Sequence, residues 1–163
     1  MTVQIQPPVP TTARKPLPRK QASPPPLNAG DRLSRAEFER RYHAHSEIKK
    51  AELVEGIVYM PSPARFAQHS QPHLDIVTCL GLYRSATPGV LGADNATVRL
   101  DHENVVQPDA LLRLDPAWGG RSHVTADDYL AGPPERVEET AARSVSYDLG
   151  AKRRVYARNG LQE

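Results

Sequence analysis

The run NVVQPDALLRL, residues 104–114, places an acid in the middle of an apolar, strand-like segment. The acid is Asp109, and it follows Pro108 directly. An ionised carboxylate in a half-buried strand is costly unless a partner neutralises it or donates hydrogen bonds to it. A metal ion is one such partner. Asp109 is therefore a candidate metal ligand.

Other charged residues could complete a site around this acid. Acids stand at Glu52 and Glu55 and again at Glu138 and Glu139, and a lysine stands at Lys152. Two or three converging carboxylates form a site of hard oxygen ligands suited to Mg²⁺ or Mn²⁺. Such a site fits phosphodiester hydrolysis, because the metal lowers the pKa of water and neutralises charge on the phosphoryl group. A lysine beside it could orient a water or stabilise the developing charge.

Two short motifs predict how the first part of the domain folds. Ser34 stands three residues before Glu37, which is the spacing of a capping box and predicts the start of a helix. The segment AELVEGIVYMP alternates around a Glu-Gly pair and predicts a hairpin with strands at residues 51–54 and 57–60. These elements would carry the upstream acids.

The middle of the chain predicts a long helix and two paired strands. Apolar positions at helical spacing over residues 67–85 predict the main core helix, with Cys79 as a small core residue. Alternating residues then predict strands at 96–100 and 105–114, paired antiparallel across a polar turn. The alternation places Asp109 on the polar side of its strand.

The last predicted element is a helix over residues 149–158, with Asp148 as N-cap and Gly160 as C-terminal stop. Lys152 and Tyr156 share one face of this helix at i and i+4, and we expect that face to turn inward. Helices alternate with hairpins and single strands along the chain. The sequence therefore predicts an α/β or α+β class with a mixed sheet.

The chain has 163 residues, and its first thirty differ from the rest. Residues 1–30 hold eight of the 16 prolines and no acid, so we expect a disordered, proline-rich, basic tail. Residues 31–163 are enough for one domain. The tail holds four of the 21 basic residues, so the domain carries 17 basic against 19 acidic side chains and a net charge of −2. A basic tail would add weak, salt-sensitive attraction to nucleic acid.

A single cysteine excludes an internal disulfide and fits a reducing compartment. The sequence has no apolar run long enough for a membrane span or a signal peptide. We therefore expect a soluble, cytoplasmic protein without a membrane partner.

From Leu33 to its last residue, the chain resembles the putative restriction-endonuclease domain family of bacteria, a former unknown-function family of the PD-(D/E)xK nuclease superfamily. The segments that carry the resemblance are AELVEGIVYMPSP, QHSQPH, ATPGVLGADNATVRLDHENVVQPDALLRL, DDYLAGPPE and SYDLGAKRRVYARNGLQE.

The resemblance implies a restriction-endonuclease-like core, in which helices flank a mixed β-sheet. It also implies Mg²⁺ or Mn²⁺ as cofactor, DNA as partner and a homodimer as one arrangement. The metal would lie between Asp109, the matching superfamily aspartate, and Glu139, the matching glutamate, with Glu52 or Glu55 as the upstream acid. The implied catalytic residues are Asp109, Glu139, Lys152, Glu52 and Glu55, and the implied metal ligands are Asp109, Glu139 and Glu55.

The chain departs from the family pattern on its C-terminal side. The superfamily lysine stands two residues after the glutamate, where this chain has Ala141, and Lys152 matches a lysine moved to the following helix. Arg136 and Glu138 occupy positions where the family's strand is apolar, and burying either without a partner is costly. The family also continues into a further strand beyond Glu163. We therefore expect a domain that is truncated at its C-terminus and lacks this strand.

Two functional hypotheses follow from the sequence. The first is a metal-dependent endonuclease that hydrolyses DNA phosphodiester bonds. The alternative is a truncated, catalytically inactive remnant or binding module of the same fold.

Overall fold

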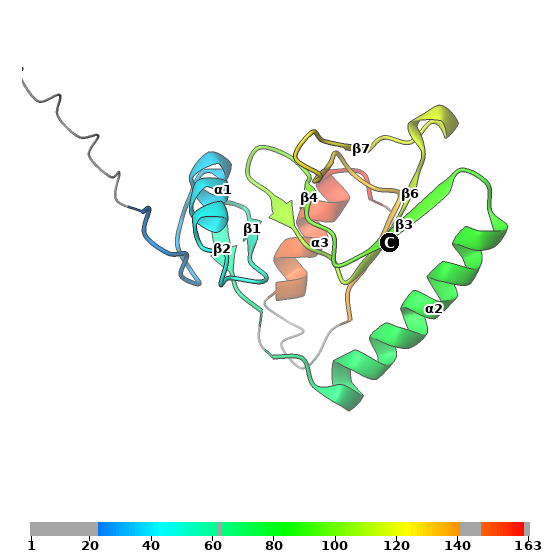
Figure 1. The fold of residues 1–163 in the computed structure, drawn as a ribbon, viewed down its shortest axis with the longest axis horizontal. Coiled ribbons are helices and arrows are strands. Elements are labelled where there is room, and N and C mark those ends of the chain that lie inside the picture. Colours follow the sequence, from blue (N-terminus) through cyan, green and yellow to red (C-terminus); the bar gives the residue numbers. More distant parts are fainter. Residues whose placement is uncertain (1–22, 62, 141–147, 162–163) are drawn as a thin grey trace, which may run out of the picture.

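The computed structural model describes residues 23–61, 63–140 and 148–161, which form a mixed α/β fold (Figure 1). The larger sheet has six strands in the order β2-β1-β5-β4-β8-β7, with β4 and β8 parallel and the other neighbours antiparallel. The sheet is thus mixed, as predicted. Its strands are β1 (Glu52–Val54), β2 (Ile57–Tyr59), β4 (Val98–Arg99), β5 (Val105–Val106), β7 (His123–Val124) and β8 (Leu130–Ala131).

A second, smaller sheet has three antiparallel strands in the order β3-β6-β9. These strands are β3 (Val90–Asp94), β6 (Ala110–Leu114) and β9 (Arg136–Glu138). A short 3₁₀-helix, Pro116–Trp118, follows β6.

Both motifs predicted near the start of the domain are confirmed. Helix α1 (Arg35–Ala44) begins after Ser34, whose hydroxyl oxygen accepts a hydrogen bond from the Glu37 backbone N–H at 3.3 Å. The turn between β1 and β2 has positive φ at both Glu55 and Gly56, as a tight two-residue hairpin requires. The hairpin and α1 share a core that also buries Leu27, which lies ahead of the domain boundary expected at residue 31.

The strand predicted over residues 105–114 is wrong as a single strand. It divides into β5 in the large sheet and β6 in the small one, with Pro108 buried at the break. Proline has no backbone N–H to donate to a ladder. The chain also crosses from β3 to β4 at the same level, where Asn95 has a φ of 50°. The two sheets therefore meet at a joint formed by these two breaks.

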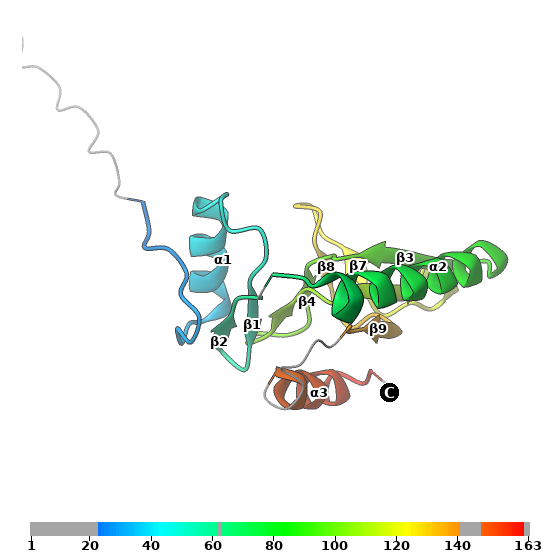
Figure 2. The same ribbon diagram turned by 90° about the horizontal axis from the view of Figure 1, so that it is seen from below.

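Helix α3 (Asp148–Arg158) covers one face of this joint, and Figure 2 shows it below the strands and clear of α2. Its Val155 and Tyr156 are buried against Leu111 of β6 and residues of the large sheet. The predicted stop at Gly160 is confirmed, because its φ of 73° lets the Gly160 and Leu161 N–H groups donate to the last carbonyls of the helix. The predicted N-cap side chain of Asp148 lies outside the described residues.

The helix predicted over residues 67–85 is found, but its role as the main core helix is wrong. Helix α2 (Gln71–Ala86) follows a five-residue π-helical turn, Phe66–Ser70, and runs along β3 and β6. None of its described residues is fully buried, and Leu74 and Leu82 are 65% and 67% exposed. Cys79, expected in the core, is also exposed. The core is instead built by α1, α3 and the sheets, so helical spacing did identify a helix but not its buried face.

The charges expected to disturb β9 are accommodated without burial. Arg136 is exposed, and its guanidinium forms an ion pair with Glu138 two residues along the same strand. Strand β9 lies at the margin of the small sheet among the described strands, so these side chains reach solvent. Within residues 23–61, 63–140 and 148–161, the helices are too short or too polar to cross a lipid bilayer.

A matched pair of leucine substitutions tests this distribution of the core. Leu82→Ala in α2 should change the free energy of unfolding by less than about 0.5 kcal/mol, because the side chain is mostly exposed. Leu53→Ala in β1 should cost about 2–5 kcal/mol, because that side chain is fully buried. Urea unfolding of both variants measures the difference. Equal losses would mean that the outer face of α2 is covered in solution.

Candidate functional site

The small sheet aligns three polar side chains at the joint between the sheets. Strand β6 is antiparallel to β3 and to β9, and continuing both registers by one position brings Asp109 between Asn95 and Glu139. The Asn95 backbone N–H donates to the Asp109 carbonyl at 3.1 Å. Residues opposite each other in antiparallel strands point to the same face. Asp109 and Glu139 therefore share the face on which Leu111 packs against α3.

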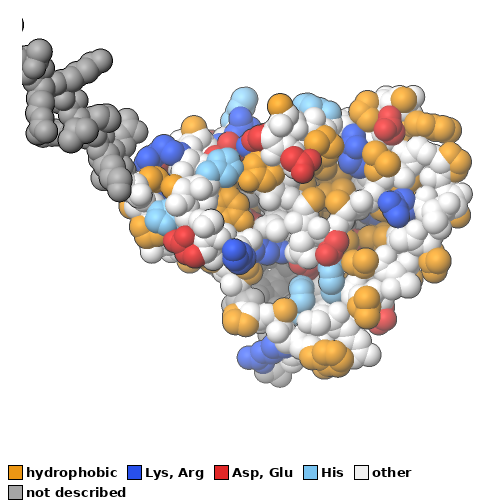
Figure 3. All heavy atoms as spheres, viewed as in Figure 1, with side chains coloured by type: hydrophobic (Ala, Val, Ile, Leu, Met, Phe, Trp, Pro, Cys, Tyr) orange, Lys and Arg blue, Asp and Glu red, His pale blue; other side chains and the backbone are white. Residues whose placement is uncertain are grey.

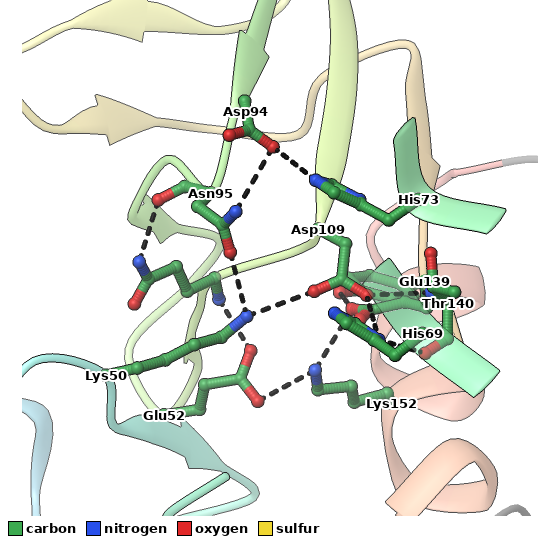
Figure 4. A network of polar contacts seen from close by, with 12 residues as sticks. Lys50, Glu52, His69, His73, Asp94, Asn95, Asp109, Glu139, Thr140 and Lys152 are labelled. Carbon is green, nitrogen blue, oxygen red and sulfur yellow. Dashed lines mark hydrogen bonds and ion pairs between the residues drawn. The ribbon is translucent and has the colours of Figure 1, made fainter. Parts of the chain in front are cut away.

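The Asp109 carboxylate is buried and has partners on both oxygens (Figure 4). Its Oδ1 accepts a hydrogen bond from the Lys50 ammonium at 3.2 Å, and its Oδ2 accepts one from the Thr140 backbone N–H at 2.8 Å. The same ammonium donates to Asn95 Oδ1 at 3.2 Å. The sequence placed Asp109 on the polar side of its strand, and its partners are indeed polar, but they also bury the carboxylate at the joint.

Glu52, Glu139 and Lys152 form a second, linked group beneath this carboxylate. Lys152 Nζ lies 2.7 Å from Glu52 Oε2 and 3.0 Å from Glu139 Oε1. The Tyr156 hydroxyl donates to the same Glu139 oxygen at 2.6 Å. Glu52 Oε1 accepts from the Gln107 backbone N–H at 2.7 Å. The group therefore joins β1, the end of β9 and α3, and the inward face predicted for Lys152 and Tyr156 is found.

Burial sets the protonation behaviour of this group. Burial raises the pKa of the Glu139 carboxyl and outweighs the opposing effect of Lys152, whose single ammonium is shared with Glu52. Burial alone would lower the pKa of Lys152, but the two carboxylates outweigh it and the pKa is raised. Burial and the nearby carboxylates hold the pKa of Tyr156 well above its usual value, so its hydroxyl stays a donor.

Two histidines flank the site on the side of α2. The rings of His69 and His73 stack with their centroids 5.8 Å apart. His69 Nδ1 lies 2.9 Å from the Thr140 carbonyl oxygen and 3.9 Å from Asp109 Oδ2. His73 Nε2 lies 2.9 Å from Asp94 Oδ1. The QHSQPH segment therefore lies against the acids, and Figure 3 shows acidic, basic and histidine side chains around a recess on this face.

The donor chemistry of the site fits a hard divalent cation. Glu52, Asp109 and Glu139 face two ammonium groups, which leaves one net negative charge when all five groups are ionised. Gln107 and Thr140, whose backbone N–H groups donate to Glu52 and Asp109, each have a buried side-chain oxygen with no hydrogen-bond partner among the described residues. In that part of the chain, no three His, Cys, Asp or Glu side chains already converge as a metal cluster. A cation would therefore compete with the ammonium groups for carboxylate oxygens.

Two of the acids considered from sequence lie elsewhere. The Glu55 carboxylate forms ion pairs with Arg154 at 3.0 Å and Arg158 at 3.7 Å, on the side of α3 away from Lys152. Glu138 pairs with Arg136 along β9. The structure therefore groups Glu52, rather than Glu55, with the other site residues.

The sequence analysis did not assign Lys50 or Asn95 to the site. A signal for Lys50 was present, because residues two apart in a strand share a face and Lys50 stands two before Glu52. Asn95 gave a weaker signal within GADN, where asparagine tolerates the left-handed backbone that ends β3. Its position opposite Asp109 depends on the β3–β6 register and could not be obtained from the sequence alone.

Removing the shared cation tests the buried group. Lys152→Met should cost about 3–5 kcal/mol of unfolding free energy at pH 7.5, because Glu52 and Glu139 lose their counter-charge. Without it, the pKa of the Glu139 carboxyl, already raised by burial, rises further in the folded state. The folded variant then binds more protons than the unfolded one and gains stability as the pH falls. The deficit relative to the parent should therefore shrink at pH 5.

Urea unfolding at the two pH values measures this deficit, and Lys49→Met is the matched control. Lys49 is exposed and donates to the Ser46 carbonyl, so its loss should change stability little at either pH. A Lys152→Met deficit that is small, or equal at both pH values, would contradict the buried ion group.

Among the comparisons with known proteins, the match to a family model bears out the resemblance seen in the sequence. A solved structure described as a putative nuclease belonging to DUF820, from Anabaena variabilis, shares 16% identity with a TM-score of 0.48. The match covers 63% of this chain and 56% of that chain, so it spans little more than half of that structure. No curated protein matches. The model of the Uma2 family, described as "Putative restriction endonuclease", matches residues 35–163 and so includes every site residue described above. The chain therefore belongs to the Uma2 family of putative restriction endonucleases.

Proposed function

We propose that this protein is a divalent-metal-dependent endonuclease that hydrolyses phosphodiester bonds of DNA. The observation that carries the proposal is that Glu52, Asp109 and Glu139 are each paired with one of two lysines at the joint between the sheets. Glu52 and Asp109 are buried, Glu139 is largely buried, and the group carries one uncompensated charge. Carboxylate oxygens of this kind are the donors that Mg²⁺ or Mn²⁺ prefers. Family membership supports nuclease chemistry, and the family description supports DNA as the substrate class.

Glu52, Asp109 and Glu139 would hold the cation. When bound, the cation supplies a water of lowered pKa and neutralises charge on the phosphoryl group. The protein's own contribution is to keep these carboxylates oriented: Thr140 N–H fixes Asp109, Gln107 N–H fixes Glu52, and Tyr156 fixes Glu139. Carboxylates held in this way do not need to reorganise during the reaction.

The proposed reaction adds water across one ester bond of the DNA backbone. The water oxygen bonds to phosphorus, the leaving oxygen takes a proton, and the products are a phosphate monoester and a free hydroxyl. Negative charge grows on the phosphate oxygens in the transition state. Positive groups beside the carboxylates therefore stabilise the transition state more than the substrate.

The expected homodimer stays a prediction, which sedimentation of the purified protein would check.

Plasmid cleavage with Mg²⁺ or Mn²⁺ tests the proposal, and Asp109→Asn is the informative variant. The substitution removes one ligand charge with little change in volume, so cleavage should fall at least about 100-fold. In the parent, metal at 100 times its dissociation constant should add about 2.7 kcal/mol to the free energy of unfolding, and this gain should be smaller in Asp109→Asn.

Glu103→Gln is the control, because Glu103 is an exposed acid in the turn between β4 and β5. It should cleave DNA and respond to metal as the parent does. A parent that melts cooperatively but neither cleaves DNA nor gains stability from metal would contradict the nuclease proposal. Retained DNA binding in such a protein would favour the alternative, a binding module of the same fold.

A further inference from the structure

The two lysines of the site differ in how completely carboxylates neutralise their charges. Lys152 comes from α3, is 12% exposed, and pairs with two carboxylates. Lys50 comes from the residues just before β1, is 22% exposed, and pairs with one carboxylate and the neutral amide of Asn95. Figure 4 shows the two side chains approaching the acids from these different elements. Only Lys50 therefore has charge to offer a further anion.

Lys152 is poorly placed to leave its partners. Turning its ammonium toward a substrate would leave Glu52 and Glu139 buried without a counter-charge, which is strongly unfavourable. Tyr156, packed in the core, already uses the Glu139 oxygen that faces the ammonium. Lys152 is therefore a fixed counter-ion of Glu52 and Glu139.

Lys50 can move without the same penalty. Asp109 keeps the hydrogen bond from Thr140 N–H on its other oxygen when the ammonium shifts. The lysine side chain is a flexible stem that carries a compact point charge, which suits contact with a phosphate oxygen. The Lys50 ammonium lies 3.2 Å from Asp109 Oδ1. Because Asp109 is a proposed ligand of the cation, a phosphodiester hydrolysed at this site would lie close to the same ammonium.

We propose that Lys50, and not Lys152, is the lysine that contacts the phosphodiester. Lys152 is then a positioning residue that acts through Glu52 and Glu139. This inference rests on the proposed nuclease function and reverses the role that the family resemblance suggested for Lys152. The ligand class is a phosphodiester oxyanion, held by the Lys50 ammonium beside Asp109.

Three methionine variants separate the two roles: Lys50→Met, Lys152→Met and the control Lys49→Met. Each is tested for thermal melting, for plasmid cleavage with Mg²⁺, and for binding of a labelled duplex without divalent metal across a range of salt. Lys50→Met should lose less stability than Lys152→Met, because it strips the counter-charge from one carboxylate that keeps the Thr140 N–H bond. At a temperature where it is folded, it should cleave about 100- to 1,000-fold more slowly than the parent. The slope of log affinity against log salt concentration should be shallower for Lys50→Met than for the parent by about 0.9, which is the value of one phosphate contact.

The other two variants should behave differently. Lys152→Met should melt at a lower temperature and, at a temperature where it is folded, keep the parent's salt slope. Lys49→Met should match the parent in all three measurements, because its ammonium is exposed and donates to the Ser46 carbonyl rather than to a residue of the site. Should Lys50→Met fail to fold, Lys50→Gln keeps a hydrogen-bond donor for Asp109 without the charge and takes its place.

The outcomes also separate this inference from the proposed function. A folded Lys50 variant with the parent's salt slope and cleavage rate would overturn the inference, as would a loss of slope in Lys152→Met alone. If the parent does not cleave DNA with either metal, the nuclease function fails. In that case a reduced salt slope in Lys50→Met would still support the phosphate contact, and an unchanged slope would overturn it.

Discussion

The ammonium of Lys152, shared between Glu52 and Glu139, is the interaction on which the arrangement of this domain depends. It links the first strand of the large sheet, the end of the last strand of the small sheet and the final helix. A buried charge is tolerated only with a close, well-oriented partner, so this group strongly restricts how the three elements can pack. The apolar contacts of Val155 and Tyr156 act over the same face, but they would tolerate small shifts that the ion group would not.

The joint between the sheets explains why the polar residues gather at this place. Strand β3 ends at Asn95, with its left-handed backbone, and the run from β5 to β6 breaks at Pro108. At both breaks the chain leaves its regular strand pairing. The side chains there find polar partners on other elements: Lys50 contacts Asn95 and Asp109, and His73 contacts Asp94. A continuous pair of strands would have buried apolar side chains here, and the acids would have had no room for lysines and histidines.

Much of the local structure could be predicted from the sequence, because local signals determine it. The Ser34 cap, the Glu55-Gly56 turn and the Gly160 stop depend on backbone preferences of single residues, and all three were found. The outer face of α2 and the break at Pro108 could not be predicted in the same way, since they depend on which elements cover one another. Lys50 was missed for a related reason, because its approach to Asp109 needs the β1–β5 pairing. Family membership was predicted, as the match over residues 35–163 bears out.

The wide separation of Glu52 and Lys152 along the chain has a consequence for the order of folding. The hairpin of β1 and β2 is local and can form early. Its acid, Glu52, gains its ion-pair partner only when α3, which is synthesised much later, is in place. Until α3 docks, Glu52 and Glu139 lack the ammonium that they share in the fold, so we expect them to repel each other and to stay hydrated. The acidic centre therefore cannot be completed before α3 has been synthesised.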